Sequence, residues 1–184
     1  MAKKLTEKTL IKKLETLSKE ELLNIIVDFY RTSKSVEAGL SLMILGNEYG
    51  NSLLKKYKKQ LDKIFNPSNV VRMGFSLDNA QRILEDFADI CVGDTGRWYG
   101  DLALYFAECA TEFTMSYGDI DEEFYDALGD AYHDAVVIAS GDEQLYLLWQ
   151  ERLESILHEF SGFGWGMEEF IADEYYSIPW IKEE

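Results

Sequence analysis

The sequence is poor in the residues that build disulfide frameworks and metal centres. Its 184 residues include two cysteines, two histidines and two prolines. Cys91 and Cys109 stand alone, with no C-x-x-C pair, so we expect neither a disulfide framework nor a zinc site. Both are interpreted as small buried hydrophobic residues, and such cysteine usage is typical of a reducing cytoplasm.

Long hydrophobic runs are also missing. The longest stretch without a charged residue is the ten-residue segment from Ala38 to Asn47. A membrane-spanning helix needs about 18 apolar residues or more, so we expect no membrane span. Lys3 and Lys4 are followed by no apolar segment, so we expect no secretory signal peptide. These absences predict a cytoplasmic protein.

Positive charge is scarce in the C-terminal part. Residues 1–72 contain 14 basic and 8 acidic residues, a net charge of +6, whereas residues 73–184 contain 4 and 26, a net charge of −22. The overall charge of −16 repels nucleic acids and anionic membranes. The asymmetry also allows the basic part to dock on the acidic part, within one chain or between two chains of a homo-oligomer.

Helical patterns, in contrast, run through almost the whole chain. Ser18 and Glu21 form a capping box, and the helix that follows is expected to bury Leu22, Ile25, Ile26 and Phe29. Capping residues, glycines and a proline separate the other helical segments. The expected helices lie at 5–17, after Ser18, from a cap at Ser35 to Leu45, at 51–66, 76–91 and 97–117, from a cap at Asp119 or Asp121 to Gly141, between Asp142 and Phe160, and at 167–176.

These segments predict an all-α protein with about nine amphipathic helices and no convincing strand. Short loops favour antiparallel neighbours, so we expect either a bundle or a short right-handed stack of helix pairs. Apolar residues make up 47% of the chain, which suffices for a core. We therefore expect a single domain over residues 1–184, with basic helices in 1–72 and acidic, aromatic helices in 73–184.

Two segments resemble a known family. The run EFTMSYGDIDEEFY from Glu112 to Tyr125, and GFGWG from Gly162 to Gly166, resemble an uncharacterised bacterial family described only as a domain of unknown function. In that family an aromatic residue and a histidine often follow the Gly-Trp-Gly, whereas this chain has Met167 and Glu168. The resemblance implies a helical cytoplasmic bacterial domain and supplies no activity, cofactor or catalytic residue.

The segment 97–117 carries a polar stripe. Asp101, Glu108 and Glu112 follow one another at spacings of seven and four, which places them on one helical face. Carboxylates four residues apart repel each other unless a cation or a proton intervenes. They can therefore be a metal or acid–base site, or a solvated edge at which Glu108 and Glu112 pair with arginines such as Arg82 or Arg152.

The chain lacks the other ligands that a metal would need. A di-iron bundle requires Glu-x-x-His on two helices, and Asp130 with His133 is one imperfect copy. An EF-hand beginning at Asp119 fails because Phe124 and Asp130 stand where glycine and glutamate belong. The sequence also shows no G-x-S-x-G and no glycine-rich phosphate loop. We therefore expect no metal, no cofactor and no catalytic residue.

The acidic part is also rich in aromatic residues, which are enriched at binding hot spots. Its carboxylates and aromatics suggest a non-catalytic interaction module that offers an acidic, aromatic surface to a basic peptide or protein. The alternative is a small-molecule or metal site around Glu108, Glu112 and Asp119. A lysine-rich helix before Pro67 is interpreted as a solvated face rather than a nucleic-acid site. The residues of the candidate surface are Glu108, Glu112, Tyr117, Asp119 and Trp165.

Overall fold

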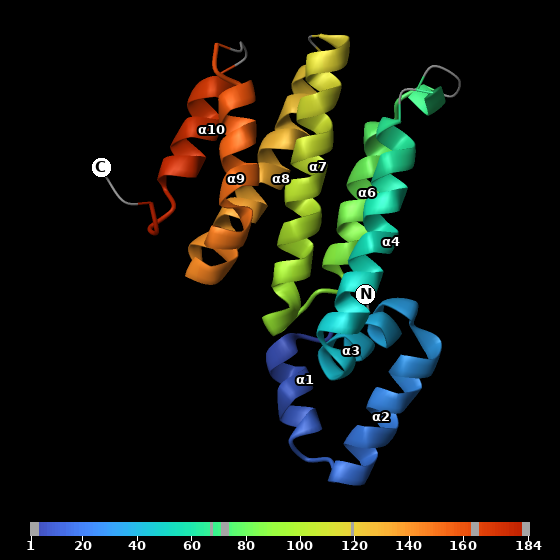
Figure 1. The fold of residues 1–184 in the computed structure, drawn as a ribbon. Helices are drawn as coiled ribbons and strands as arrows, with labels where there is room; N and C mark the ends of the chain where they lie inside the picture. The colour runs from blue at the N-terminus through green and yellow to red at the C-terminus, as the bar shows by residue number, and fades with distance from the viewer. Residues whose placement is uncertain (1–3, 67, 71–73, 119, 163–165, 182–184) are drawn as a thin grey trace.

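The computed structural model describes residues 4–66, 68–70, 74–118, 120–162 and 166–181. Within these ranges it contains no strand, and nine helices of at least seven residues pack as a bundle, which confirms the predicted fold class (Figure 1). A short 3₁₀ turn, η1 (Gly93–Thr95), precedes the longest helix. The helices are α1 (Glu7–Leu14), α2 (Lys19–Thr32), α3 (Lys34–Leu45), α4 (Asn47–Phe65), α6 (Leu77–Ala88), α7 (Gly96–Tyr117), α8 (Glu122–Ser140), α9 (Glu143–Glu159) and α10 (Met167–Tyr176).

Local capping explains where most helices begin. The Glu21 amide donates to the Ser18 hydroxyl at 3.2 Å, and the Ser18 amide donates to the Glu21 carboxylate at 2.8 Å, which completes the predicted capping box. Ser33, not Ser35, caps α3, because its backbone is extended and its hydroxyl accepts from the Val36 amide. Gly46, at φ +67°, makes the turn between α3 and α4 and is the single residue that separates the two helices.

Helix α7 lies at the centre of the bundle, in contact with α4, α6, α8 and α9 (Figure 1). Its most extensive contact is with α8. Gly100, Ala103, Ala107 and Ala110 follow one another along α7 at helical spacing, and all are buried. Small side chains allow helix axes to approach closely, so this row permits the tight packing of α7.

An aromatic cluster joins α4, α7 and α8. The ring of Phe113 lies 5.9 Å from Phe65, 4.6 Å from Phe75 and 5.7 Å from Phe124, measured between centroids. The Tyr117 ring extends the cluster toward the surface, 4.5 Å from Phe113. These contacts fix the C-terminal half of α7, where the candidate carboxylates lie.

Helices α1 and α2 lie at one end of the bundle, beyond the start of α7 (Figure 1). Neither helix contains a buried residue, and α2 packs mainly on α3. The expectation that Ile26 and Phe29 are buried is therefore wrong, since they are 46% and 58% exposed. Leu22 and Ile25 are partly buried. Apolar residues occupy several sides of helix α2. The neighbouring helices of the chain cover only some of these sides.

A close contact between α4 and α7 supplies a test of the packing. A Cβ atom at Gly50 of α4 would lie 2.3–2.5 Å from three atoms of the Trp98 indole on α7. We expect Gly50→Ala to lower the free energy of unfolding by roughly 1–3 kcal/mol, because the buried indole would have to shift. Urea unfolding followed by circular dichroism measures this change.

Gly96→Ala is the matched control. Gly96 also lies in a helix, at φ −57°, but a Cβ there would meet no atom within 4 Å. We expect this change to be neutral or to stabilise the fold by up to about 1 kcal/mol. Equal losses in the two variants would contradict the close approach of α4 to α7.

Candidate functional site

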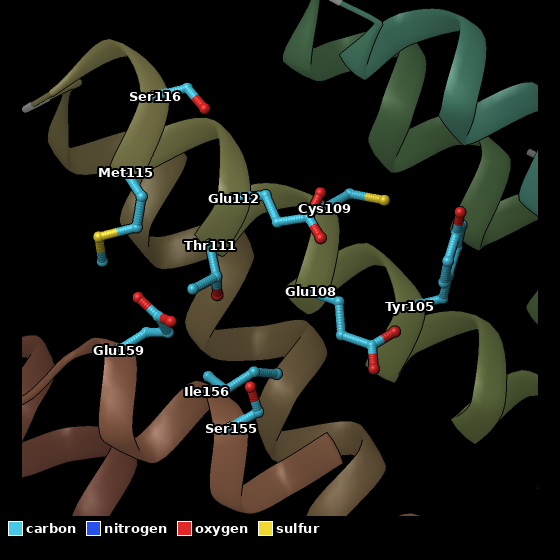
Figure 2. A pocket seen from close by; sticks show the side chains of 10 residues that line it. All are labelled: Tyr105, Glu108, Cys109, Thr111, Glu112, Met115, Ser116, Ser155, Ile156 and Glu159. Atoms are coloured by element: carbon cyan, nitrogen blue, oxygen red, sulfur yellow. The ribbon is translucent and has the colours of Figure 1, made fainter.

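A groove of about 630 Å³ runs between α7 and α9. Figure 2 shows its two walls, with the α9 side chains extending toward α7. On α9, Ser155, Ile156 and Glu159 line the groove at spacings that place them on one helical face. The α7 wall consists of Tyr105, Glu108, Cys109, Thr111, Glu112, Met115 and Ser116.

The floor of the groove is closed and apolar. Ile156 and Thr111 are both buried, and the Thr111 hydroxyl donates to the Ala107 carbonyl at 2.7 Å, so it has a partner inside its own helix. Met115 is partly exposed on the upper wall. Its thioether and the Ile156 side chain offer apolar contact to a ligand that enters between the helices.

One carboxylate of the groove is held by an arginine. The Arg152 guanidinium donates from Nε to Glu108 Oε1 at 2.6 Å and from Nη2 to Oε2 at 2.8 Å. Its Nη1 donates to Asp101 Oδ1 at 2.8 Å, and the Lys58 ammonium reaches the same oxygen at 2.8 Å. This network ties α4, α7 and α9 together. It confirms the interpretation in which Glu108 pairs with Arg152.

The network also fixes the charge of the arginine. Burial alone would lower the pKa of Arg152, but the hydrogen bonds and charges of Glu108 and Asp101 outweigh it and raise that pKa above its ordinary value. The guanidinium therefore stays charged at every pH at which the protein is folded. Both oxygens of Glu108 are occupied by this bidentate pair.

Glu112 and Glu159 are the open carboxylates of the groove. Both are exposed, and neither forms an ion pair with any described residue. Among the described residues that line the groove, none is basic. No three histidine, cysteine or acidic side chains in the described part are placed to share a metal ion. The upper groove is thus a negative surface above an apolar floor.

A second hollow adjoins the groove across α7. It measures about 270 Å³, lies between α4 and α7, and shares Tyr105, Cys109, Glu112 and Ser116 with the groove. Tyr117 lines this second hollow. Of the five residues predicted for the candidate surface, Glu108, Glu112 and Tyr117 lie in these two neighbouring hollows. Asp119 and Trp165 lie outside the described residues.

Cys109 lines both hollows but is not poised for reaction. Burial, reinforced by the nearby carboxylates of Asp62 and Glu112, raises the pKa of its thiol to about 12. A thiol with such a pKa is protonated at neutral pH and is a poor nucleophile. Tyr105, on the same side of α7, donates its hydroxyl to Asp62 Oδ1 at 2.5 Å. That tyrosine serves to join α7 to α4.

Sequence reasoning missed the α9 wall of the groove. Glu159 and its neighbours follow Arg152 at spacings of three, four and seven, so the sequence did indicate one shared face. It could not indicate that this face and Glu112 line the same groove. The lysine-rich helix is largely solvated, as predicted, except for Lys58, which is half-buried against Asp101 and Tyr105.

Comparisons with known proteins identify no relative of this chain. No protein-family model matches the chain, and no significant match was found among curated proteins or solved structures. In the described part, every helix is too short or too polar to cross a lipid bilayer.

The Arg152 network predicts a specific loss of stability. Arg152→Met would leave Glu108 and Asp101, which are 25% and 24% exposed, without their shared cation. We expect the free energy of unfolding to fall by about 1–3 kcal/mol, less than for a fully buried pair because water reaches these groups. Adding Glu108→Gln should recover part of the loss. Chemical denaturation measures all three proteins.

Arg31→Met serves as the control for that change. Arg31 lies 3.9 Å from Asp28, and its side chain is 71% exposed. Such a pair contributes less than about 0.5 kcal/mol. If Arg152→Met were as mild as Arg31→Met, the network would not be holding α9 to α7.

The high pKa of Cys109 predicts slow alkylation. Its rise from 9.0 to about 12 leaves roughly a thousandfold less thiolate at pH 8 than in an ordinary cysteine. In a Cys91→Ala background, iodoacetamide should therefore label native Cys109 about a thousandfold more slowly than the unfolded chain. Glu112→Gln should speed labelling less than about tenfold, since burial is the larger cause. Mass spectrometry follows the rate, and labelling at the unfolded rate would contradict the burial.

Proposed function

We propose that this protein is a non-catalytic helical interaction module that binds a basic segment of a partner protein in the groove between α7 and α9. The observation that carries the proposal is the pair of open carboxylates, Glu112 and Glu159, on facing helices above an apolar floor. Figure 2 shows Glu159 extending toward the α7 wall.

The groove matches the chemistry of lysine and arginine side chains. These side chains pack their aliphatic stems on apolar surface while the charged head stays near water. Ile156 and Met115 would receive the stem, and the carboxylates of Glu112 and Glu159 would receive the charge. Hydrogen bonds between ionised partners are about twice as strong as neutral ones. A volume of about 630 Å³ is also within the range of ligand-binding clefts.

The long-range field favours the same class of partner. Residues 73–184 carry a net charge of −22, and both walls of the groove belong to this part. Such a field attracts positive segments and speeds their encounter with the surface. It repels nucleic acids, which disfavours them as ligands of this groove.

The reactive groups of the described part support a non-catalytic role. Cys109 is held protonated, and Glu108 is held by Arg152. His133 lies on α8 and contacts Glu174 of α10 at 2.8 Å, away from the groove lining. A small-molecule or metal site around Glu108, Glu112 and Asp119 stays a prediction. It would require Glu108 to leave Arg152.

A defined peptide tests the proposal. The probe is a synthetic basic peptide of about 15 residues, with leucines at helical spacing and lysines elsewhere, a pattern suited to helix-in-groove binding. We expect the double variant Glu112→Gln, Glu159→Gln to weaken its binding about tenfold or more, because both charged contacts are lost. Fluorescence anisotropy at about 50 mM and about 300 mM salt measures the affinity, which should fall with salt.

The control is a double variant that removes the same charge elsewhere. Glu151 and Glu143 are exposed on α9 and do not line the groove. Glu143→Gln with Glu151→Gln should change the affinity less than about twofold, as expected for distant surface charges. Equal weakening by the two double variants would mean that the probe senses only the net charge, and would count against the groove. So would equal binding of a peptide with glutamate in place of lysine.

A further inference from the structure

Helix α2 presents an exposed apolar stripe. Leu23, Ile26, Val27 and Tyr30 follow one another at spacings of three, one and three, and therefore lie on one side of the helix. They are 52%, 46%, 39% and 41% exposed. Helices α1 and α2 project beyond the start of α7 in Figure 1, whereas the groove lies along the C-terminal half of α7. The stripe is thus independent of the proposed binding groove.

Other apolar side chains of α1 and α2 are exposed as well. Phe29 on α2 and Leu10 and Ile11 on α1 are 58%, 41% and 47% exposed. Soluble monomers rarely expose contiguous apolar patches larger than a few hundred Å², and larger ones mark interaction sites. Isolated exposed leucines would need no explanation, but a stripe at helical spacing has the pattern of a helix face that packs on another helix.

We propose that α2 pairs in antiparallel orientation with α2 of a second copy of this chain. In a pair related by a twofold axis, the same stripe packs on itself. Ile26 and Val27, at the middle of the stripe, lie closest to the axis. Leu23 of each copy then lies opposite Tyr30 of the other, so an aliphatic side chain packs against an aromatic ring at both ends.

The charges beside the stripe favour this occupant and this orientation. Glu20 lies near the start of α2 and Arg31 near its end, eleven residues or about three helical turns apart, and so on the same flank of the stripe. With Leu23 opposite Tyr30, antiparallel pairing brings each Glu20 within two residues, or about 3 Å along the helix axis, of the partner's Arg31, on both sides of the axis. Parallel pairing would place these flanks on opposite sides of the interface, so it would bring no Glu20 next to an Arg31. Within its own chain Arg31 has only a distant contact, 3.9 Å from Asp28.

A lipid surface matches the stripe less well. Glu20, Glu21 and Asp28 give α2 three acidic residues, against Lys19 and Arg31. Helices that lie on anionic membranes are rich in lysine and arginine on their polar face. Glu20 at one end of α2 and Arg31 at the other are instead complementary to a second, antiparallel copy of the same helix.

The size of the stripe sets the strength of the dimer. Helix α2 has 14 residues and is about 21 Å long. Complexes that bury less than about 1,200 Å² in total are weak and transient. We therefore expect a reversible dimer with a dissociation constant on the order of micromolar, rather than an obligate one.

Sedimentation velocity of the full chain between about 1 and 200 µM tests the proposal, since these concentrations bracket a micromolar dissociation constant. The wild-type protein should shift from monomer to dimer over this range. Val27→Asp should remain monomeric, because it buries a charge in the stripe. The matched change Val137→Asp, at a 53% exposed valine on α8, should dimerise like the wild type. Circular dichroism checks that all three proteins keep their helices.

Charge exchange tests the orientation. Glu20→Arg and Arg31→Glu should each weaken the dimer about threefold or more, and the double variant Glu20→Arg, Arg31→Glu should restore it, because the ion pairs re-form in reverse. A wild-type protein that stays monomeric at the highest concentration would overturn the proposal, as would a Val27→Asp protein that still dimerises. Flotation of the monomer with anionic vesicles would assign the stripe to a lipid surface and overturn it as well.

Discussion

The packing of α7 against its neighbours is the constraint on which the rest of the structure depends. Gly100 shows how tight this packing is, since a Cβ there would lie 2.7 Å from the Trp149 indole of α9 and 3.0 Å from Ile138 of α8. The row of alanines that follows keeps the same helix face narrow. The close approach of Gly100 to Trp149 brings α9 against α7, and these two helices supply the walls of the groove.

The acidity of the groove follows from where the cations are. Helix α7 has neighbours on several sides, so its polar stripe lies at the junction with α4 and α9. Arg152 and Lys58 neutralise Asp101 and Glu108 in the middle of that junction. Residues 73–184 contain 4 basic residues against 26 acidic ones, so few cations remain for the carboxylates beyond Glu108. Glu112 and Glu159 therefore lack a basic partner because this part of the chain has few basic residues, as well as because of where the two side chains lie.

Much of the fold could be predicted from the sequence, because helix ends are encoded locally. Ser18, Asp121 and Asp142 cap the helices that follow them, and the last helix has the predicted bounds, residues 167–176. The exposure of Ile26 and Phe29 could not be predicted. Periodicity shows that a face is apolar, but it does not show whether the chain supplies a helix to cover it. For the same reason Glu112 was found, whereas Glu159 on the other wall of the groove was not.

Tyrosine hydroxyls of the acidic part provide hydrogen-bond partners for several carboxylates within the chain. Tyr99 donates to Asp134 at 2.5 Å, and Tyr175 donates to Glu154 at 2.7 Å, so carboxylates between helices have hydroxyl partners. These bonds hold the helices of the acidic part together, just as the bond from Tyr105 to Asp62 joins α7 to α4. The open carboxylates and the apolar stripe of α2 are then two different kinds of incomplete surface. Salt weakens the attraction of the open carboxylates for a basic segment, but it leaves apolar burial at the α2 stripe intact. Ionic strength therefore distinguishes binding at the groove from pairing through α2.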